Sequence, residues 1–97
     1  MDEDMPDAVE FPITGELDLH TFRPSDLGSL LPEYLGECQQ RGILTVRVIH
    51  GKGTGTLREG VHQLLSRMPL VAGWTWPAAE TYGGWGATWV QLQPRQD

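Results

Sequence analysis

The chain has 97 residues, thirteen of them acidic and seven basic, and a formal net charge of -6. This length indicates one domain, and a single cysteine, Cys38, excludes an internal disulfide and a cysteine-based zinc cage. The apolar runs are too short to span a bilayer and the acidic N-terminus has no apolar signal core, so we expect a cytoplasmic protein without membrane contact.

The negative charge is concentrated at the N-terminus. Residues 1–16 hold six of the thirteen acidic residues and no Lys or Arg, so residues 17–97 carry seven of each sign. The acidic net charge therefore does not argue against a polyanionic partner for the rest of the chain. We interpret residues 1–12 as an acidic disordered arm, since they lack hydrophobic periodicity, and residues 13–97 as the folded domain.

The first half of the domain reads as strand, helix, strand. Residues 16–20 alternate polar and apolar side chains, which predicts a short strand. Apolar side chains at helical spacing from Leu27 to Cys38 predict a helix that Gly42 ends and that Pro32 kinks or delays. Residues 44–49 are rich in β-branched side chains and almost continuously apolar, as in a central strand.

The second half reads as helix, strand, strand. A second amphipathic stripe from Leu57 to Met68 predicts a helix that Pro69 closes. Residues 71–77 and 87–92 predict strands, separated by a glycine-rich turn at residues 83–86. We therefore expect an α/β fold of the two-layer sandwich type, β-α-β-α-β-β, with a four-stranded mixed sheet and both helices on one face. Right-handed crossovers make the first three strands parallel, and the fourth returns as a hairpin.

Polar and glycine-rich segments follow all three parallel strands. His20 ends the first, His50 and a glycine loop follow the second, and residues 83–86 follow the third. Ligands of open α/β sheets bind at the carboxyl edge of such strands. We therefore expect the candidate site at this edge.

The glycine loop is suited to an anion. It comprises Gly51, Lys52, Gly53, Thr54 and Gly55. Its backbone amides and the start of the following helix favour phosphate, although the spacing is neither that of a Walker loop nor that of a dinucleotide-binding fingerprint. A glycine turn that merely makes room is the alternative interpretation.

Charged side chains near the loop point to catalysis or binding. Arg58, on the first turn of the second helix, adds a guanidinium fork for phosphate. Asp18 and His20 lie two residues apart on a strand, so the carboxylate can orient the ring for general acid/base catalysis, with His50 as a second candidate. A surface pair and a loose metal site are alternatives, and we predict no metal ligand set. His62 is expected on the solvent side of its helix.

Four tryptophans remain: Trp74, Trp76, Trp85 and Trp89. We expect most of them to pack in the core or on the sheet. Trp85 lies inside the glycine turn with Gly84 and Gly86, where its indole either stacks on a base or covers the sheet edge.

Three segments resemble the Smr (small MutS-related) domain. They are Leu-Asp-Leu-His at 17–20, His-Gly-Lys-Gly at 50–53 and Gly-Gly-Trp-Gly at 83–86, within a similarity that covers about residues 16–93. Thr21, where the family often has glycine, is a departure. The resemblance implies a fold similar to the C-terminal domain of translation initiation factor three, nucleic-acid binding, and in many members endonuclease or nicking activity.

Three functional hypotheses follow. The chain looks like a stand-alone Smr protein that cleaves DNA or RNA; alternatively, it is a non-catalytic nucleic-acid-binding module, or an interaction domain linked to ribosomes or DNA repair. No cofactor is predicted, and dependence on a divalent metal stays open. We expect a monomer. The composition of the acidic arm favours a solubilising tail, and the alternative hypothesis is that the arm mimics phosphate and folds over the basic edge.

Overall fold

The protein is represented by a computed structural model that describes residues 12–95, so the predicted arm lies outside the described residues except for Pro12. The elements are β1 (Glu16–Asp18), η2 (Pro24–Asp26), α1 (Leu27–Gln40), β2 (Thr45–Ile49), α2 (Thr56–Leu65), β3 (Val71–Thr75), η3 (Glu80–Tyr82), η4 (Gly84–Gly86) and β4 (Ala87–Leu92). The predicted order of helices and strands is confirmed. None of the helices within residues 12–95 is long and apolar enough to cross a bilayer.

The four strands form one mixed sheet in the order β1-β2-β4-β3. Strand β1 pairs with β2 in parallel, and β4 is antiparallel to both β2 and β3. The first three strands therefore run in the same direction, as predicted, and β4 returns between β2 and β3. This arrangement brings the start of β4 to the same edge as the end of β2.

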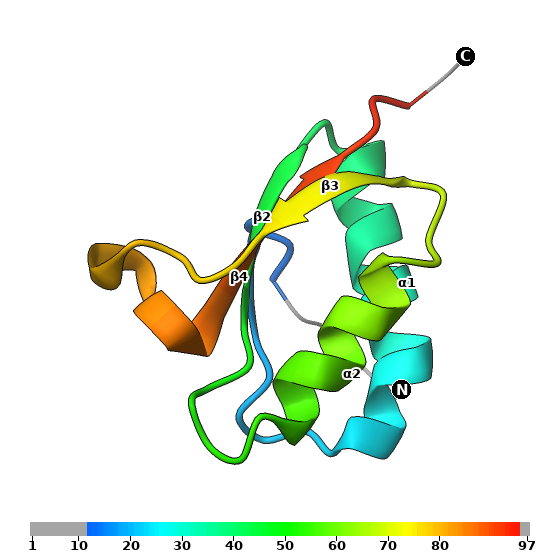
Figure 1. The fold of residues 1–97 in the computed structure, drawn as a ribbon. Coiled ribbons are helices and arrows are strands. Elements are labelled where there is room, and N and C mark those ends of the chain that lie inside the picture. Colours follow the sequence, from blue (N-terminus) through cyan, green and yellow to red (C-terminus); the bar gives the residue numbers. More distant parts are fainter. Residues whose placement is uncertain (1–11, 96–97) are drawn as a thin grey trace, which may run out of the picture.

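Both helices cover the same face of the sheet (Figure 1). Alternation along the strands directs Val46 and Val48 of β2, and Val90 and Leu92 of β4, into the core between the sheet and the helices. Leu31 and the other apolar side chains of the α1 stripe fill the other side of this core. Burial of these side chains is the main force that holds the two layers together.

Within residues 12–95, the opposite face of the sheet carries no α-helix. There the turn that contains η3 places Tyr82 against Trp89 of β4, with ring centroids 5.6 Å apart. Arg47 of β2 donates to the Tyr82 carbonyl at 3.0 Å and pairs with Glu16 of β1 at 2.9 Å. These contacts fix the turn that leads into the glycine-rich segment at residues 83–86.

Three local details differ from the sequence prediction. Strand β1 ends at Asp18 instead of His20, because the Asp18 carboxylate accepts the His20 amide and turns the chain. Helix α2 ends at Leu65 instead of Met68. Helix α1 runs unbroken through Pro32, since a helix tolerates the loss of a single N–H when its apolar face is well buried.

Candidate functional site

An aspartate and a histidine form a hydrogen-bonded pair at the end of β1. Asp18 Oδ1 accepts hydrogen bonds from the His20 amide at 3.0 Å and from His20 Nδ1 at 2.8 Å. Burial raises the pKa of Asp18, but these hydrogen bonds outweigh it and hold the pKa below its ordinary value. The His20 side chain is 72% exposed, and its Nε2 forms no hydrogen bond or ion pair with another residue within 12–95. The ring is therefore oriented and presents one nitrogen to solvent.

His50 lies in a different environment. Its side chain points toward α2, is 4% exposed and uses both ring nitrogens. Nδ1 contacts the Gly51 carbonyl at 3.1 Å, and Nε2 contacts Thr88 Oγ1 at 2.9 Å. His62 Nε2 contacts the same hydroxyl at 2.8 Å. Thr88 thus joins two histidines beneath the glycine loop.

His62 corrects an expectation from the sequence. It does not lie on the solvent side of α2 but faces the sheet, where it stacks on Trp74 with centroids 4.2 Å apart. Burial lowers the pKa of His62, and the positive charges of His50, when protonated, and Arg58 lower it further. Burial also lowers the pKa of His50. Both rings are therefore neutral near pH 7.

We expect folding stability to fall as the pH drops below 6.5, the ordinary pKa of both rings. The folded state disfavours protonation of His50 and His62, so the unfolded chain binds more protons in this range. The stabilisation that comes from keeping His50 and His62 neutral is fully present above pH 6.5. It is lost as the pH falls toward the lowered pKa values of these two residues in the folded state. Melting temperatures measured from pH 7.5 to 5.5 test this.

The matched variant for that experiment is His62→Gln, which should flatten the decline. A melting temperature that rises or stays constant over this interval in the wild-type protein contradicts the expectation.

The two glycine-rich segments, at residues 50–55 and 83–86, are joined directly by hydrogen bonds. The Gly86 carbonyl accepts hydrogen bonds from the amides of His50 and Gly51, both at 2.9 Å. A Cβ atom on Gly86 would lie 3.4 Å from both the Gly51 carbonyl carbon and Lys52 Cγ. Since Leu19 also donates to the Ile49 carbonyl at 2.8 Å, all three predicted segments meet at one edge of the sheet.

The loop itself presents free backbone donors. The amides of Lys52, Gly53, Thr54 and Gly55 donate to no residue within 12–95. Gly55 has a φ of +91° and is the residue before α2, so the loop enters the helix through a left-handed turn. Gly55 has no side chain to cap the helix, and Thr54 Oγ1 instead accepts a hydrogen bond from the Thr56 amide, the first N–H of α2, at 3.4 Å. Four consecutive free amides at a helix start form a suitable cradle for an oxyanion.

Aromatic and cationic side chains border this loop. The Arg58 guanidinium lies over the Trp76 ring, 4.7 Å from its centroid. Trp76 Nε1 donates to the Trp85 carbonyl at 3.0 Å, and the two rings meet edge to face at 5.0 Å. Trp85 is 58% exposed. None of the four tryptophans belongs to the buried core of residues 12–95, whereas Trp74 and Trp89 lie on the sheet, on β3 and β4, which is the other position that the sequence predicts.

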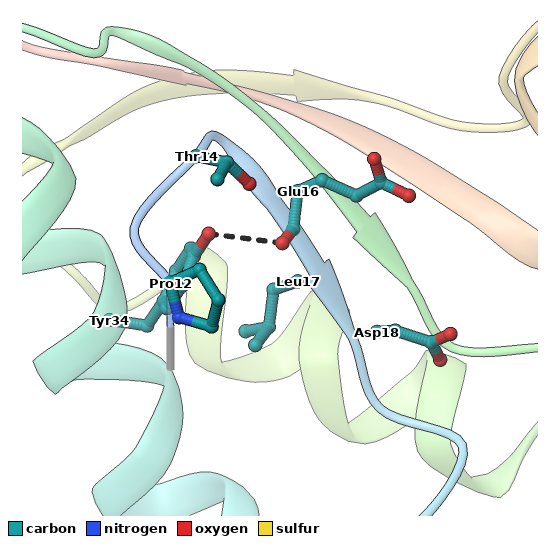
Figure 2. A pocket seen from close by; sticks show the side chains of 6 residues that line it. All are labelled: Pro12, Thr14, Glu16, Leu17, Asp18 and Tyr34. Carbon is teal, nitrogen blue, oxygen red and sulfur yellow. Dashed lines mark hydrogen bonds between the residues drawn. The ribbon is translucent and has the colours of Figure 1, made fainter. Parts of the chain in front are cut away.

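A pocket of about 260 Å³ lies beside β1, away from the glycine loop (Figure 2). It is lined by Pro12, Thr14, Glu16, Leu17, Asp18 and Tyr34. The Tyr34 hydroxyl, from α1, donates to the Glu16 carbonyl at 3.0 Å and closes one side (Figure 2). Among the predicted site residues, only Asp18 lines this pocket, so the pocket is distinct from the loop cradle.

The structure thus separates the predicted catalytic residues by environment. Asp18 and His20 are exposed at the edge, whereas His50 is buried on the helix side with its nitrogens occupied. Sequence reasoning missed Thr88 and Trp76, because no motif marks either residue. Within residues 12–95, no group of three His, Cys, Asp or Glu side chains is placed to hold a metal ion.

Sequence comparison relates the chain to long proteins. Two relatives are named endonuclease MutS2: one from Thermomicrobium roseum, 46% identical over 65% of this chain, and one from Geobacillus thermodenitrificans, 41% identical over 80%. The matches cover 8% and 10% of those proteins, so the chain spans about a tenth of their length.

Structural comparison gives the same relationship. The Smr domain of Thermus thermophilus MutS2 superposes with a TM-score of 0.78 at 33% identity, covering 84% of this chain and all of that domain. YdaL of Escherichia coli, a stand-alone small MutS-related protein, has a similar fold, with a TM-score of 0.77, 23% identity, and coverage of 89% of this chain and 70% of that one. The family model described as Smr domain matches residues 17–93. The chain therefore belongs to the Smr domain family.

Proposed function

We propose that this protein binds nucleic acid through the glycine loop and cleaves a phosphodiester bond within the strand, with His20 as general acid or base. The observation that carries this proposal is the Asp18–His20 pair, whose exposed Nε2 lies at the same sheet edge as the free loop amides. The names of the relatives, which describe endonucleases, support the same class of reaction.

The loop would bind the phosphate. Its four free amides supply hydrogen bonds, and Lys52 adds a positive charge at the loop surface. Arg58, held over Trp76, adds a second charge close to the start of α2. Charge that develops on the phosphate oxygens in the transition state would meet donors that are already in place.

His20 would move the proton. Asp18 holds Nδ1, so the proton of a neutral ring sits on Nδ1 and Nε2 is left as the base. On RNA, Nε2 would accept the 2′-hydroxyl proton as that oxygen attacks the phosphorus. The bond to the 5′-oxygen would break, with water supplying the proton to this leaving oxygen, and a 2′,3′-cyclic phosphate would remain. On DNA, Nε2 would activate a water molecule instead. The solvent exposure of Nε2 permits either reaction.

The bases would lie against the tryptophans. Trp85 exposes more than half of its surface beside the loop, with Gly84 and Gly86 forming its turn. An indole in this position offers a stacking surface that does not select among bases. This arrangement supports binding of an unpaired nucleotide next to the bound phosphate.

A cleavage assay tests the proposal. Supercoiled DNA and a structured RNA are incubated with the wild-type protein, with and without chelator, and both product ends are determined. Loss of cleavage with chelator indicates a metal-dependent reaction, and retained cleavage of RNA alone indicates attack by the 2′-hydroxyl. If neither nucleic acid is cut, the catalytic part of the proposal is wrong.

A non-catalytic binding module is the second candidate. It is favoured by the burial of His50, which leaves one histidine, not two, with a free nitrogen at the edge. Tight, salt-dependent binding without cleavage would support this candidate.

Lys52→Ala should weaken binding to every nucleic-acid sequence by a similar factor and reduce the salt slope by about one. The reason is that an exposed lysine on the loop contacts phosphate rather than bases. Affinity measured from 50 to 200 mM salt tests this. Arg67→Ala, an exposed cation beyond the end of α2, is the control and should leave the slope unchanged. An unaltered slope for Lys52→Ala contradicts the assignment of the loop.

A further inference from the structure

A buried hydrogen-bond chain runs from α2 through the sheet to the glycine loop. It passes from His62 to Thr88 and then to His50, which contacts the Gly51 carbonyl. Thr88 is completely buried and His50 is 4% exposed, so water does not replace the hydrogen bond between these two residues, whereas His62 is partly buried. Only one placement of the protons on these hydrogen bonds is consistent, because the Gly51 carbonyl at the end can only accept.

The Gly51 carbonyl sets the direction of the chain. A carbonyl oxygen only accepts, so His50 Nδ1 carries the proton of that hydrogen bond. Because His50 is neutral, its Nε2 is a lone pair, and the single hydroxyl proton of Thr88 is donated to it. Thr88 Oγ1 is then left as an acceptor, so His62 Nε2 carries a proton. The two histidines are thus held in opposite tautomers.

The chain ends on a peptide whose orientation matters to the loop. In a trans peptide, the C=O and the following N–H point in opposite directions. When His50 holds the Gly51 carbonyl inward, the Lys52 amide points outward, and this amide is the first of the four free donors. Gly51 has a φ of +82°, and its own amide, which belongs to the preceding peptide, donates to the Gly86 carbonyl, so the backbone that leads into the Gly51–Lys52 peptide is also held in place.

The far end of the chain is also held in place. Trp74 stacks on the His62 ring at 4.2 Å, and Trp76 meets it edge to face at 5.6 Å. These rings limit rotation of His62 and keep its Nε2 directed at Thr88. The Trp76 ring also lies under the Arg58 guanidinium, so Trp76 contacts both the cation beside the loop and the His62 ring of the hydrogen-bond chain.

We propose that His50, Thr88 and His62 are positioning residues that fix the Gly51–Lys52 peptide with its N–H directed at a bound phosphate. The proposal deepens the function proposed above and rests on it for the identity of the ligand. It gives His50 a role other than proton transfer to the substrate, and it gives Thr88 and His62 roles that no sequence motif indicates.

The wild-type protein provides the first test. In the full-length ¹⁵N-labelled chain, long-range ¹H–¹⁵N spectra distinguish the ring tautomers at pH 7.5. We expect His50 to carry its proton on Nδ1 and His62 on Nε2. If His50 carries its proton on Nε2, or His62 on Nδ1, the proposed hydrogen-bond arrangement is wrong, whether or not the protein binds phosphate.

Two substitutions at Thr88 provide the second test. Thr88→Ser keeps the hydroxyl, whereas Thr88→Val has nearly the same shape without it. Inorganic phosphate is titrated into each protein, and binding is followed by the shift of the Lys52 amide resonance. We expect Thr88→Val to bind about five to ten times more weakly, as for the loss of one hydrogen bond, and Thr88→Ser to bind like the wild type.

Val90→Ala separates positioning from general destabilisation. Val90 is completely buried on the same face of β4, but its apolar side chain forms none of the hydrogen bonds that join His62, Thr88 and His50. It should lower the melting temperature without weakening phosphate binding. Equal weakening in Val90→Ala and Thr88→Val overturns the positioning role. The expected tautomers in a wild-type protein that binds neither phosphate nor nucleic acid would instead overturn the proposed function.

Discussion

Replacing His20 by alanine is expected to reduce cleavage by about two to four orders of magnitude while affinity for the nucleic acid changes little. The reason is that His20 presents a free Nε2 to solvent, whereas the groups that would hold the phosphate belong to the loop. Since the side chain is 72% exposed, its removal should not alter the fold. Initial rates at saturating substrate, together with binding curves, measure the two effects separately.

Asp18→Asn is the matched partner of this variant. It preserves the shape of the residue but removes the carboxylate that accepts from Nδ1 and the His20 amide. We expect a smaller loss of rate than for His20→Ala, because the ring remains but its tautomer and orientation are no longer fixed. Equal rates in the wild-type protein and His20→Ala would exclude His20 as the catalytic residue and would indicate a contaminating nuclease.

Replacing Gly86 by valine is expected to destabilise the fold by about 1–3 kcal/mol and to abolish the binding site. A Cβ at this position already meets the Gly51 carbonyl carbon and Lys52 Cγ at 3.4 Å, so the two further methyl groups have no room. The displaced turn would also pull the Gly86 carbonyl away from the amides of His50 and Gly51. Urea unfolding and nucleic-acid binding measure the two losses.

The loop offers a control for this substitution. Gly53 is exposed, has no atom within 4 Å of an added Cβ, and does not have a positive φ. Gly53→Val should therefore leave the unfolding free energy within about 0.5 kcal/mol of the wild type. Gly86→Ala should fall between the wild type and Gly86→Val. A Gly86→Val protein with normal stability and binding would show that contact between the two segments is not needed.

The arrangement of the site explains why glycines are concentrated at this edge. Gly86 lets the third segment approach the second, and Gly55, where an added Cβ would lie 2.8 Å from Arg58 Nη2, leaves space for the guanidinium. Arg58 is consequently free to lie over Trp76 beside the loop amides. Each of these glycines therefore serves a close approach between two parts of the site.

Much of the fold was predictable because local patterns and the tertiary structure agree. The helical stripe that starts at Leu27 faces the core, and so do Val46 and Val48 of the predicted strand 44–49. The prediction failed at β1 and at α1, for two different reasons. The Asp18 carboxylate ended β1 two residues early, and burial of the α1 stripe carried that helix through Pro32.

The sequence by itself determined the order of the elements, the glycine loop and the pairing of Asp18 with His20, since each depends on residues close together in the chain. Only the tertiary structure decided the roles of His50, His62 and Thr88, which lie after β2, on α2 and on β4. The insertion of β4 between β2 and β3 places Thr88 between the two histidines. The physical reason is that the hydrogen bonds of a buried ring depend on which strand lies beside it, and no local pattern contains that information.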